Sequence, residues 1–279
     1  MSDGRLAARL WVLGAAVVWS TAGAAIKKTA LPGAAIAGGR SLVAALFLLA
    51  LFPASRTRPT RKMLGAALAY AATVVLFVAA NKMTTAANAI FIQDTAPLWV
   101  LLLSPRLLGE RPTRGELLAV PMFLGGLTLF FLDRLDGRQL AGNAVALVAG
   151  VTFAFSIMGL RAASGERTAV LVWGNAIAAA VTLPFALAGP APTGADLAIV
   201  VFLGIVQLGL GYAMFARGVD RTPAVEASLL VLLEPVLNPV WAFVLTGERP
   251  GPWALCGGAV VLAATVWRTV AAPPAADPR

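Results

Sequence analysis

The sequence contains no histidine and a single cysteine, Cys256, among its 279 residues. Without histidine there is no histidine-ligated metal site, no histidine proton relay and no Ser-His-Asp triad. One cysteine excludes a disulfide within the chain. Charged residues make up only 13%, where a soluble domain averages about 25%. We therefore expect no metal site, no cofactor and no enzyme activity.

Apolar residues, in contrast, make up 59% of the sequence. Apolar runs of about 20 residues recur along the chain, and each is long enough to cross a bilayer core of about 30 Å. These runs predict an all-α polytopic membrane protein with ten transmembrane helices, embedded in a lipid bilayer. The expected spans are residues 10–27, 33–52, 63–81, 84–105, 113–132, 140–160, 168–188, 195–216, 222–245 and 252–270.

The net charge of +9 reflects how basic residues are distributed between these spans. In a soluble protein such a charge would suggest nucleic acid, but here Lys and Arg collect in short loops, so we expect no nucleic-acid partner. If the N-terminus is inside, 15 of the 22 Lys and Arg residues lie in inner segments and six in outer ones, with Arg40 inside a span. This bias predicts a bacterial-type inner membrane protein with both termini cytoplasmic.

One polar string, GERP, occurs twice, at residues 109–112 and 247–250, which are 138 positions apart. Gly109 suits a helix C-terminus, where positive φ is common. Pro112 suits the first turn of a following helix. Each GERP string is therefore predicted to be a tight connection between two spans.

Further identities accompany this repeat. A shift of 138 positions places Pro97 on Pro235, and a shift of 136 places "WSTAG" (19–23) on "FSIMG" (155–159). We expect two five-helix repeats, at residues 1–138 and 139–270, followed by a disordered tail at 271–279. Because five is odd, the second repeat enters from the other side of the membrane. Such inverted repeats are typical of secondary transporters, whose substrate site lies between the repeats.

Four stretches also carry a family resemblance. They are "AAVVWSTAGAAIKK", "GGRSLVAALFLL", "APLWVLLLSPRLLGERPT" and "LLEPVLNPVWAFVLTGERP". In this order they resemble the EamA-type, ten-helix branch of the drug/metabolite transporter (DMT) superfamily, and within it the YddG-like exporters of aromatic amino acids. The resemblance implies a basket of ten helices that exports small metabolites. It also implies a central cavity lined mainly by spans one, three, four, six, eight and nine.

Charged residues inside apolar spans are costly and usually face a cavity or a partner. Asp94, near the middle of span four, is expected either to bind a substrate amine or coupling proton, or to be structural. Glu234 has the same two interpretations. Arg40 could hold a substrate carboxylate, although we favour a structural pairing with Asp94 or Glu234. Glu226, near the end of a span, is expected to be solvated.

The other candidates are polar or aromatic residues within the spans. Trp19 and Phe155 are expected to be repeat mates that sandwich a flat substrate or close a gate, although ordinary helix packing is the alternative for each. The remaining cavity candidates are Ser20, Tyr70, Phe77, Asn88, Gln93, Ser156, Gln207 and Tyr212, with Phe153 and Trp173 as further aromatics. Pro97, Pro235 and Asn238 are expected to be structural.

These observations favour a monomeric secondary transporter that exports small amphipathic solutes by alternating access. Neutral or aromatic amino acids are the preferred substrates, and a coupling proton is possible. A proton-coupled exporter of drugs or other metabolites fits the same residues. A membrane-embedded, lipid-modifying enzyme and a passive channel are the alternatives from other classes.

Overall fold

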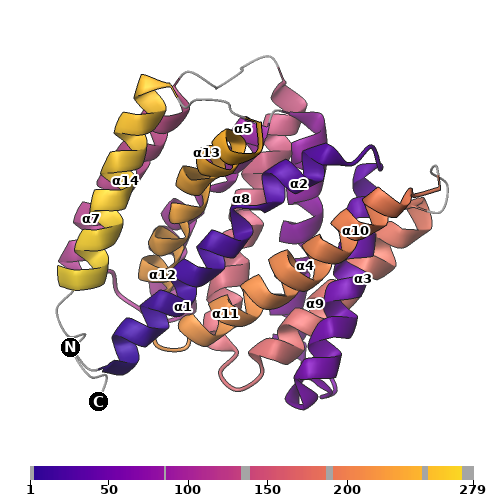
Figure 1. Cartoon of the computed structure of the whole chain (residues 1–279). Helices are drawn as coiled ribbons and strands as arrows, with labels where there is room; N and C mark the ends of the chain where they lie inside the picture. Colours follow the sequence, from indigo (N-terminus) through magenta and orange to yellow (C-terminus); the bar gives the residue numbers. More distant parts are fainter. Residues whose placement is uncertain (1–2, 85, 133–138, 187–190, 247–250, 272–279) are drawn as a thin grey trace.

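The computed structural model describes residues 3–84, 86–132, 139–186, 191–246 and 251–271. Within these ranges the chain forms helices and no strands (Figure 1). The first half contains α1 (Asp3–Trp19), α2 (Ala22–Lys28), α3 (Gly33–Leu51), the 3-10 helix η1 (Pro53–Ser55), α4 (Arg61–Met83), α5 (Ala86–Gln93), α6 (Ala96–Leu107) and α7 (Arg114–Phe131). The second half contains α8 (Leu140–Ala162), α9 (Arg167–Ala186), α10 (Gly194–Phe202), the π-helix η2 (Leu203–Leu210), α11 (Gly211–Gly218), α12 (Ala224–Val231), α13 (Leu233–Thr246) and α14 (Pro252–Ala271).

Six helical stretches within the described ranges are long and apolar enough to cross a membrane. They are Gly4–Lys28, Gly33–Leu51, Arg61–Met83, Leu140–Ala162, Arg167–Ala186 and Gly194–Gly218. The chain is therefore a multi-pass membrane protein. The expected spans 84–105 and 222–245 are each divided into two shorter helices, α5 with α6 and α12 with α13.

The first GERP connection is a sharp turn between α6 and α7. Gly109 has a φ of 69°, the left-handed conformation that glycine adopts without a steric penalty. Thr113 is the N-cap of α7, because its side chain accepts a hydrogen bond from the backbone N–H of Glu116 at 3.3 Å. The prediction that Pro112 lies in the first turn was therefore wrong, since the helix begins only at Arg114. The second GERP, residues 247–250, lies outside the described residues.

The α1 helix packs against α11 and α12, and α4 packs against α8 and α9. The most extensive packing joins α4 to α8 and α3 to α9, and α7 pairs with α14 at one side (Figure 1). Small residues let α4 and α8 approach closely, since a Cβ on Gly159 would lie 2.8 Å from that of Ala66. This is the small-residue packing typical of membrane helices.

Three helical stretches of the described chain are interrupted, after α1, after α5 and after α12. The first break follows α1, where the Ser20 hydroxyl donates to the carbonyl of Val17 at 2.6 Å. The second lies at Asp94 and Thr95, just before Pro97, which has no N–H to donate. The third lies at Leu232, between α12 and α13. Leu232 is 138 residues after Asp94 (232 − 94), the same separation as the two GERP strings.

Candidate functional site

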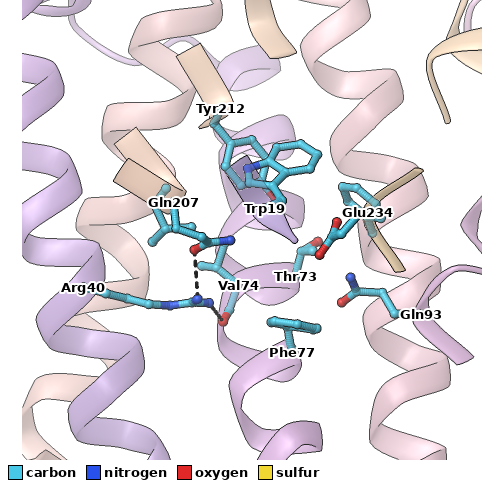
Figure 2. Close-up of a pocket in the computed structure, with 11 residues that line it drawn as sticks. Trp19, Arg40, Thr73, Val74, Phe77, Gln93, Gln207, Tyr212 and Glu234 are labelled. Carbon is cyan, nitrogen blue, oxygen red and sulfur yellow. Dashed lines mark hydrogen bonds between the residues drawn. The ribbon is translucent and has the colours of Figure 1, made fainter. Parts of the chain in front are cut away.

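A small, largely closed cavity lies where these interrupted helices meet (Figure 2). Its walls are formed by Trp19, Arg40, Thr73, Val74, Phe77, Gln93, Phe153, Gln207, Leu208, Tyr212 and Glu234. The space free of protein atoms is about 330 Å³, but the part open to the centres of water-sized molecules is only about 30 Å³. That is room for about two waters. A larger solute can therefore enter only if the helices move apart.

Arg40 forms one end of the cavity and is 1% exposed. Its Nη2 donates to the carbonyl of Val74 at 2.7 Å, and its Nη1 donates to Oε1 of Gln207 at 3.2 Å. Within the described residues it makes no ion pair, so the expected pairing with Asp94 or Glu234 was wrong. Because two neutral oxygens orient the guanidinium without neutralising it, the positive charge remains available to a ligand.

Glu234 and Gln93 lie across the cavity from Arg40 (Figure 2). Asp94, the residue after Gln93, is 2% exposed and close enough to Glu234 for their carboxyl groups to interact electrostatically. Among the described residues, Oε1 of Gln93 and Oδ2 of Asp94 are buried without a hydrogen-bond partner. Nearly all buried polar atoms in proteins are paired. Unpaired acceptors beside Glu234 therefore make this end suited to a donor-rich, cationic group.

Aromatic rings form the wall between the two ends. The Trp19 ring centroid lies 4.4 Å from that of Tyr212 and 6.0 Å from that of Phe153. Gly211 makes this arrangement possible, because a Cβ there would lie 2.5 Å from Nε1 of Trp19. Phe77 faces this group from the opposite wall (Figure 2). The cavity thus has an apolar middle between a guanidinium group at one end and a carboxyl group at the other.

Tyr70 lies behind this wall. Its ring makes an edge contact with Tyr212 at 4.6 Å, and its hydroxyl accepts a hydrogen bond from Nδ2 of Asn175 at 2.9 Å. Asn175 and the cavity residue Thr73 were not among the sequence candidates. Both are polar residues within apolar runs, so the rule that selected Gln93 could have found them.

Several other candidates lie elsewhere. Phe155 is 40% exposed and does not line the cavity, so its predicted place there was wrong, and Phe153 occupies that wall instead. Ser20 is buried and accepts a hydrogen bond from Nε1 of Trp241 at 2.7 Å. Ser156 is buried, and its Oγ has no hydrogen-bond partner in the part of the chain that the structure describes.

Asn88 belongs to a separate polar cluster, in which its Nδ2 donates to Oδ1 of Asn143 at 3.0 Å. Trp173 donates from Nε1 to the carbonyl of Thr57 at 3.1 Å, outside the cavity. Pro97 and Pro235 are buried near the starts of α6 and α13. The side chain of Asn238 lies outside the described residues.

At the end of the molecule where α8 finishes, Glu110 of the first GERP string joins several helices. Its Oε1 lies 2.6 Å from Nε of Arg161, and its Oε2 accepts from the backbone N–H of Ala224 at 2.9 Å. Arg161 also donates from Nη1 to the carbonyl of Val219 at 3.1 Å, and to that of Asp220. The first GERP string therefore does more than form a turn, because its acid, Glu110, connects the α6–α7 loop to α8 and to the start of α12.

Two further ion pairs lie at this end. Arg167 Nη1 is 2.8 Å from Oδ1 of Asp220, and Arg9 Nε is 2.9 Å from Oε1 of Glu226. The Arg9–Glu226 pair is almost fully buried. The expectation that Glu226 is solvated was therefore wrong, because α1 packs over the start of α12 and covers it.

A basic residue makes similar contacts at the opposite end. Lys27 donates from Nζ to the carbonyl of Asn81 at 2.6 Å and more weakly to that of Thr84 at 3.4 Å. Val219, which accepts from Arg161, is 138 residues after Asn81 (219 − 81). Lys27 thus holds the C-terminal end of α4, and Arg161 holds the C-terminal end of α11. Each of these two cations belongs to a helix near the start of its half of the chain. Nowhere in the described ranges does a group of three or more His, Cys, Asp or Glu side chains lie close enough together to hold a metal ion.

Comparison with known proteins identifies the family of the chain. The sequence profile of the EamA-like transporter family matches residues 6–132 and 140–269. A probable terminal-alkyne amino-acid exporter of Streptantibioticus cattleyicolor is 28% identical over 93% of this chain and 92% of its own length. An uncharacterized transporter of Archaeoglobus fulgidus is 28% identical over 76% of this chain and 78% of its own.

A crystal structure with 21% sequence identity shares the fold, with a TM-score of 0.79 over 96% of this chain and 99% of that one. The family match covers almost the whole chain, including the GERP connections and the helices that line the cavity. The chain therefore belongs to the EamA-like transporter family of the DMT superfamily.

Proposed function

We propose that this transporter exports small zwitterionic solutes, with neutral or aromatic amino acids as its preferred substrates, by alternating access. The observation that carries the proposal is the cavity with Arg40 at one end, Glu234 at the other and Trp19 between them. An amino acid carries a carboxylate and an ammonium group on one carbon and can have an apolar side chain. Such a solute complements both ends and the middle.

Cavity size supports a carrier mechanism. A cavity with room for about two waters is too small for an amino acid, so binding requires the cavity to expand. The breaks beside Ser20, Asp94 and Leu232 lie where helix halves can tilt independently. The ion pair of Glu110 and Arg161 holds one end together. This contact must open when the cavity communicates with that side.

The proposed architecture is ten membrane spans in two inverted repeats, residues 1–138 and 139–270, with cytoplasmic termini in the inner membrane. Three observations support it: the family profile matches two ranges, α5–α6 and α12–α13 break 138 residues apart, and Lys27 and Arg161 make comparable contacts. Two repeats related by a two-fold axis in the membrane plane can exchange conformations, so that the site faces each side in turn.

The comparison adds support for the substrate class. The relative from Streptantibioticus cattleyicolor, which aligns over almost the whole chain, is described as a probable amino-acid exporter. Terminal-alkyne amino acids carry the same zwitterionic head as ordinary amino acids. We therefore propose that the head is recognised by the charged ends and that the aromatic wall sets the side-chain preference.

Counterflow in proteoliposomes tests this proposal. Vesicles containing the full chain are loaded with unlabelled phenylalanine, tryptophan, methionine, threonine or methyl viologen, and uptake of labelled phenylalanine is measured. We expect the amino acids, but not methyl viologen, to produce transient accumulation of the label. Uptake that never exceeds equilibrium would indicate a channel. Conversion of the lipid would indicate an enzyme, and no uptake by folded protein would remove the amino-acid proposal.

A proton-coupled exporter is the second candidate, because Asp94 and Glu234 interact electrostatically beside the cavity. Two carboxyl groups in a site with little water form a natural place to hold one proton during the cycle. If export is proton-coupled, an imposed pH gradient will drive accumulation of the label without preloaded substrate. Asp94→Asn will abolish this accumulation but preserve counterflow. A pH gradient without effect on the unaltered protein would exclude the coupling.

A further inference from the structure

A second hollow lies away from the central cavity, on the outer side of the helices near the N-terminal end of α1. It is an open groove lined by Trp11, Phe52, Gly165, Arg167, Thr168, Leu210, Ala213, Met214, Ala216 and Arg217. The volume open to the centres of water-sized molecules is about 410 Å³, far larger than the 30 Å³ of the central cavity. The proposed transport cycle assigns this groove no role.

One wall of the groove is a helical stripe that changes from apolar to basic. Leu210, Ala213, Met214 and Arg217 are spaced i, i+3, i+4 and i+7, so they share one face of the helix that continues from η2 into α11. Leu210 is 44% exposed. The stripe thus offers an apolar surface that leads to a guanidinium at the end of α11.

Arg217 differs from the other arginine of the groove. Arg167 forms an ion pair with Asp220 and donates from Nε to the carbonyl of Leu160 at 2.8 Å. Arg217 is exposed, and within the described residues its side chain forms no ion pair or hydrogen bond. Its guanidinium carbon lies over the Trp11 ring, 5.1 Å from the ring centroid. The ring positions the cation through a cation–π interaction. Its N–H donors remain available to an anion.

We propose that this groove binds an anionic phospholipid. The phosphate would accept hydrogen bonds from Arg217, whose planar fork matches phosphate oxygens. One acyl chain would lie along Leu210, Ala213 and Met214, inside the bilayer. Charge complementarity selects the occupant: the groove is apolar along the membrane-spanning helix and basic at its end, as a lipid is apolar along its chains and anionic at its head.

Thermal unfolding of the delipidated, full-length protein in detergent tests the proposal. Phosphatidylglycerol and phosphatidylcholine with identical acyl chains are titrated separately. We expect phosphatidylglycerol to raise the unfolding temperature more than phosphatidylcholine. Arg217→Gln should weaken the apparent affinity for phosphatidylglycerol about five-fold. Arg106→Gln, which changes an exposed arginine at the end of α6, should leave that affinity unchanged.

A second variant tests the apolar part of the groove. Ala213→Trp fills it but retains both arginines, so it should also remove the preference for phosphatidylglycerol. Equal stabilisation by both lipids, or equal losses in Arg217→Gln and Arg106→Gln, would overturn the proposal. Stabilisation by inorganic phosphate alone to the same extent would identify a simple anion site and would also overturn it. Transport is not part of the readout, so the result is independent of the proposed substrate.

Discussion

Nε of Arg161 lies 2.6 Å from Oε1 of Glu110, and this ion pair joins the end of α8 to the GERP turn between α6 and α7. The other oxygen of Glu110 accepts the backbone N–H of Ala224, the first residue of α12. The C-terminal end of α12 is the break at Leu232, two residues before Glu234. One carboxylate thus connects an end of the molecule to a helix that reaches the cavity.

Glu110→Gln should loosen this end, because the amide cannot form the ion pair with Arg161. Each group is about 25% exposed, so solvent screening limits the loss of stability to about 1 kcal/mol. Hydrogen exchange of the backbone amides at residues 219–226 should nevertheless accelerate. Glu166→Gln, which changes an exposed acid in the neighbouring loop, is the control and should leave this exchange unchanged. Equal effects of both variants would contradict the connecting role of Glu110.

The Arg9–Glu226 pair predicts a different pattern, because both side chains are buried. Arg9→Met should destabilise the protein by up to about 3–5 kcal/mol, since it removes the cation that lies 2.9 Å from the buried Glu226 carboxylate. Adding Glu226→Gln should recover much of that loss. Unfolding measurements on the single and double variants provide the test. A double variant no more stable than Arg9→Met would show that the two residues act independently.

Trp19→Ala should reduce counterflow of phenylalanine about ten-fold or more, because it removes the ring between the charged ends of the cavity. Phe155→Ala is the matched control, since Phe155 is exposed and outside the cavity. It should leave counterflow unchanged in protein that unfolds at the same temperature. Comparable losses in the two variants would remove Trp19 from the proposed site.

Gly211→Ala tests the same wall without removing a side chain. The added Cβ would lie 2.5 Å from Nε1 of Trp19, so the indole must move and counterflow should fall. Gly125→Ala, on α7, places its Cβ in open space and should leave counterflow unchanged and raise helix stability by up to about 1 kcal/mol. If Gly211→Ala transports phenylalanine at the rate of the unaltered protein, the position of Trp19 is not critical.

The family and the helical, multi-pass character could be predicted from the sequence, because apolar runs and turn residues are local signals. Burial of Trp19 and Tyr212 followed from their places within such runs. The partners of Arg40 could not be predicted, since the Val74 carbonyl becomes an acceptor only through the packing of α3 against α4. Phe153 and Phe155 differ by two residues, or about 200° around a helix, so Phe155 lies on the face of α8 away from the cavity and Phe153 lies on the face towards it.

The central claim is that Arg40 and Glu234 recognise opposite charges of one solute. Competition by phenylalanine, its methyl ester and its N-acetyl derivative, measured in counterflow, tests it directly. In the unaltered protein we expect phenylalanine to compete best. In Glu234→Gln, the N-acetyl derivative, which lacks the ammonium group, should compete as well as phenylalanine. In Arg40→Gln, the methyl ester, which lacks the carboxylate, should compete as well as phenylalanine. Folded variants that rank the three compounds as the unaltered protein does would contradict the account.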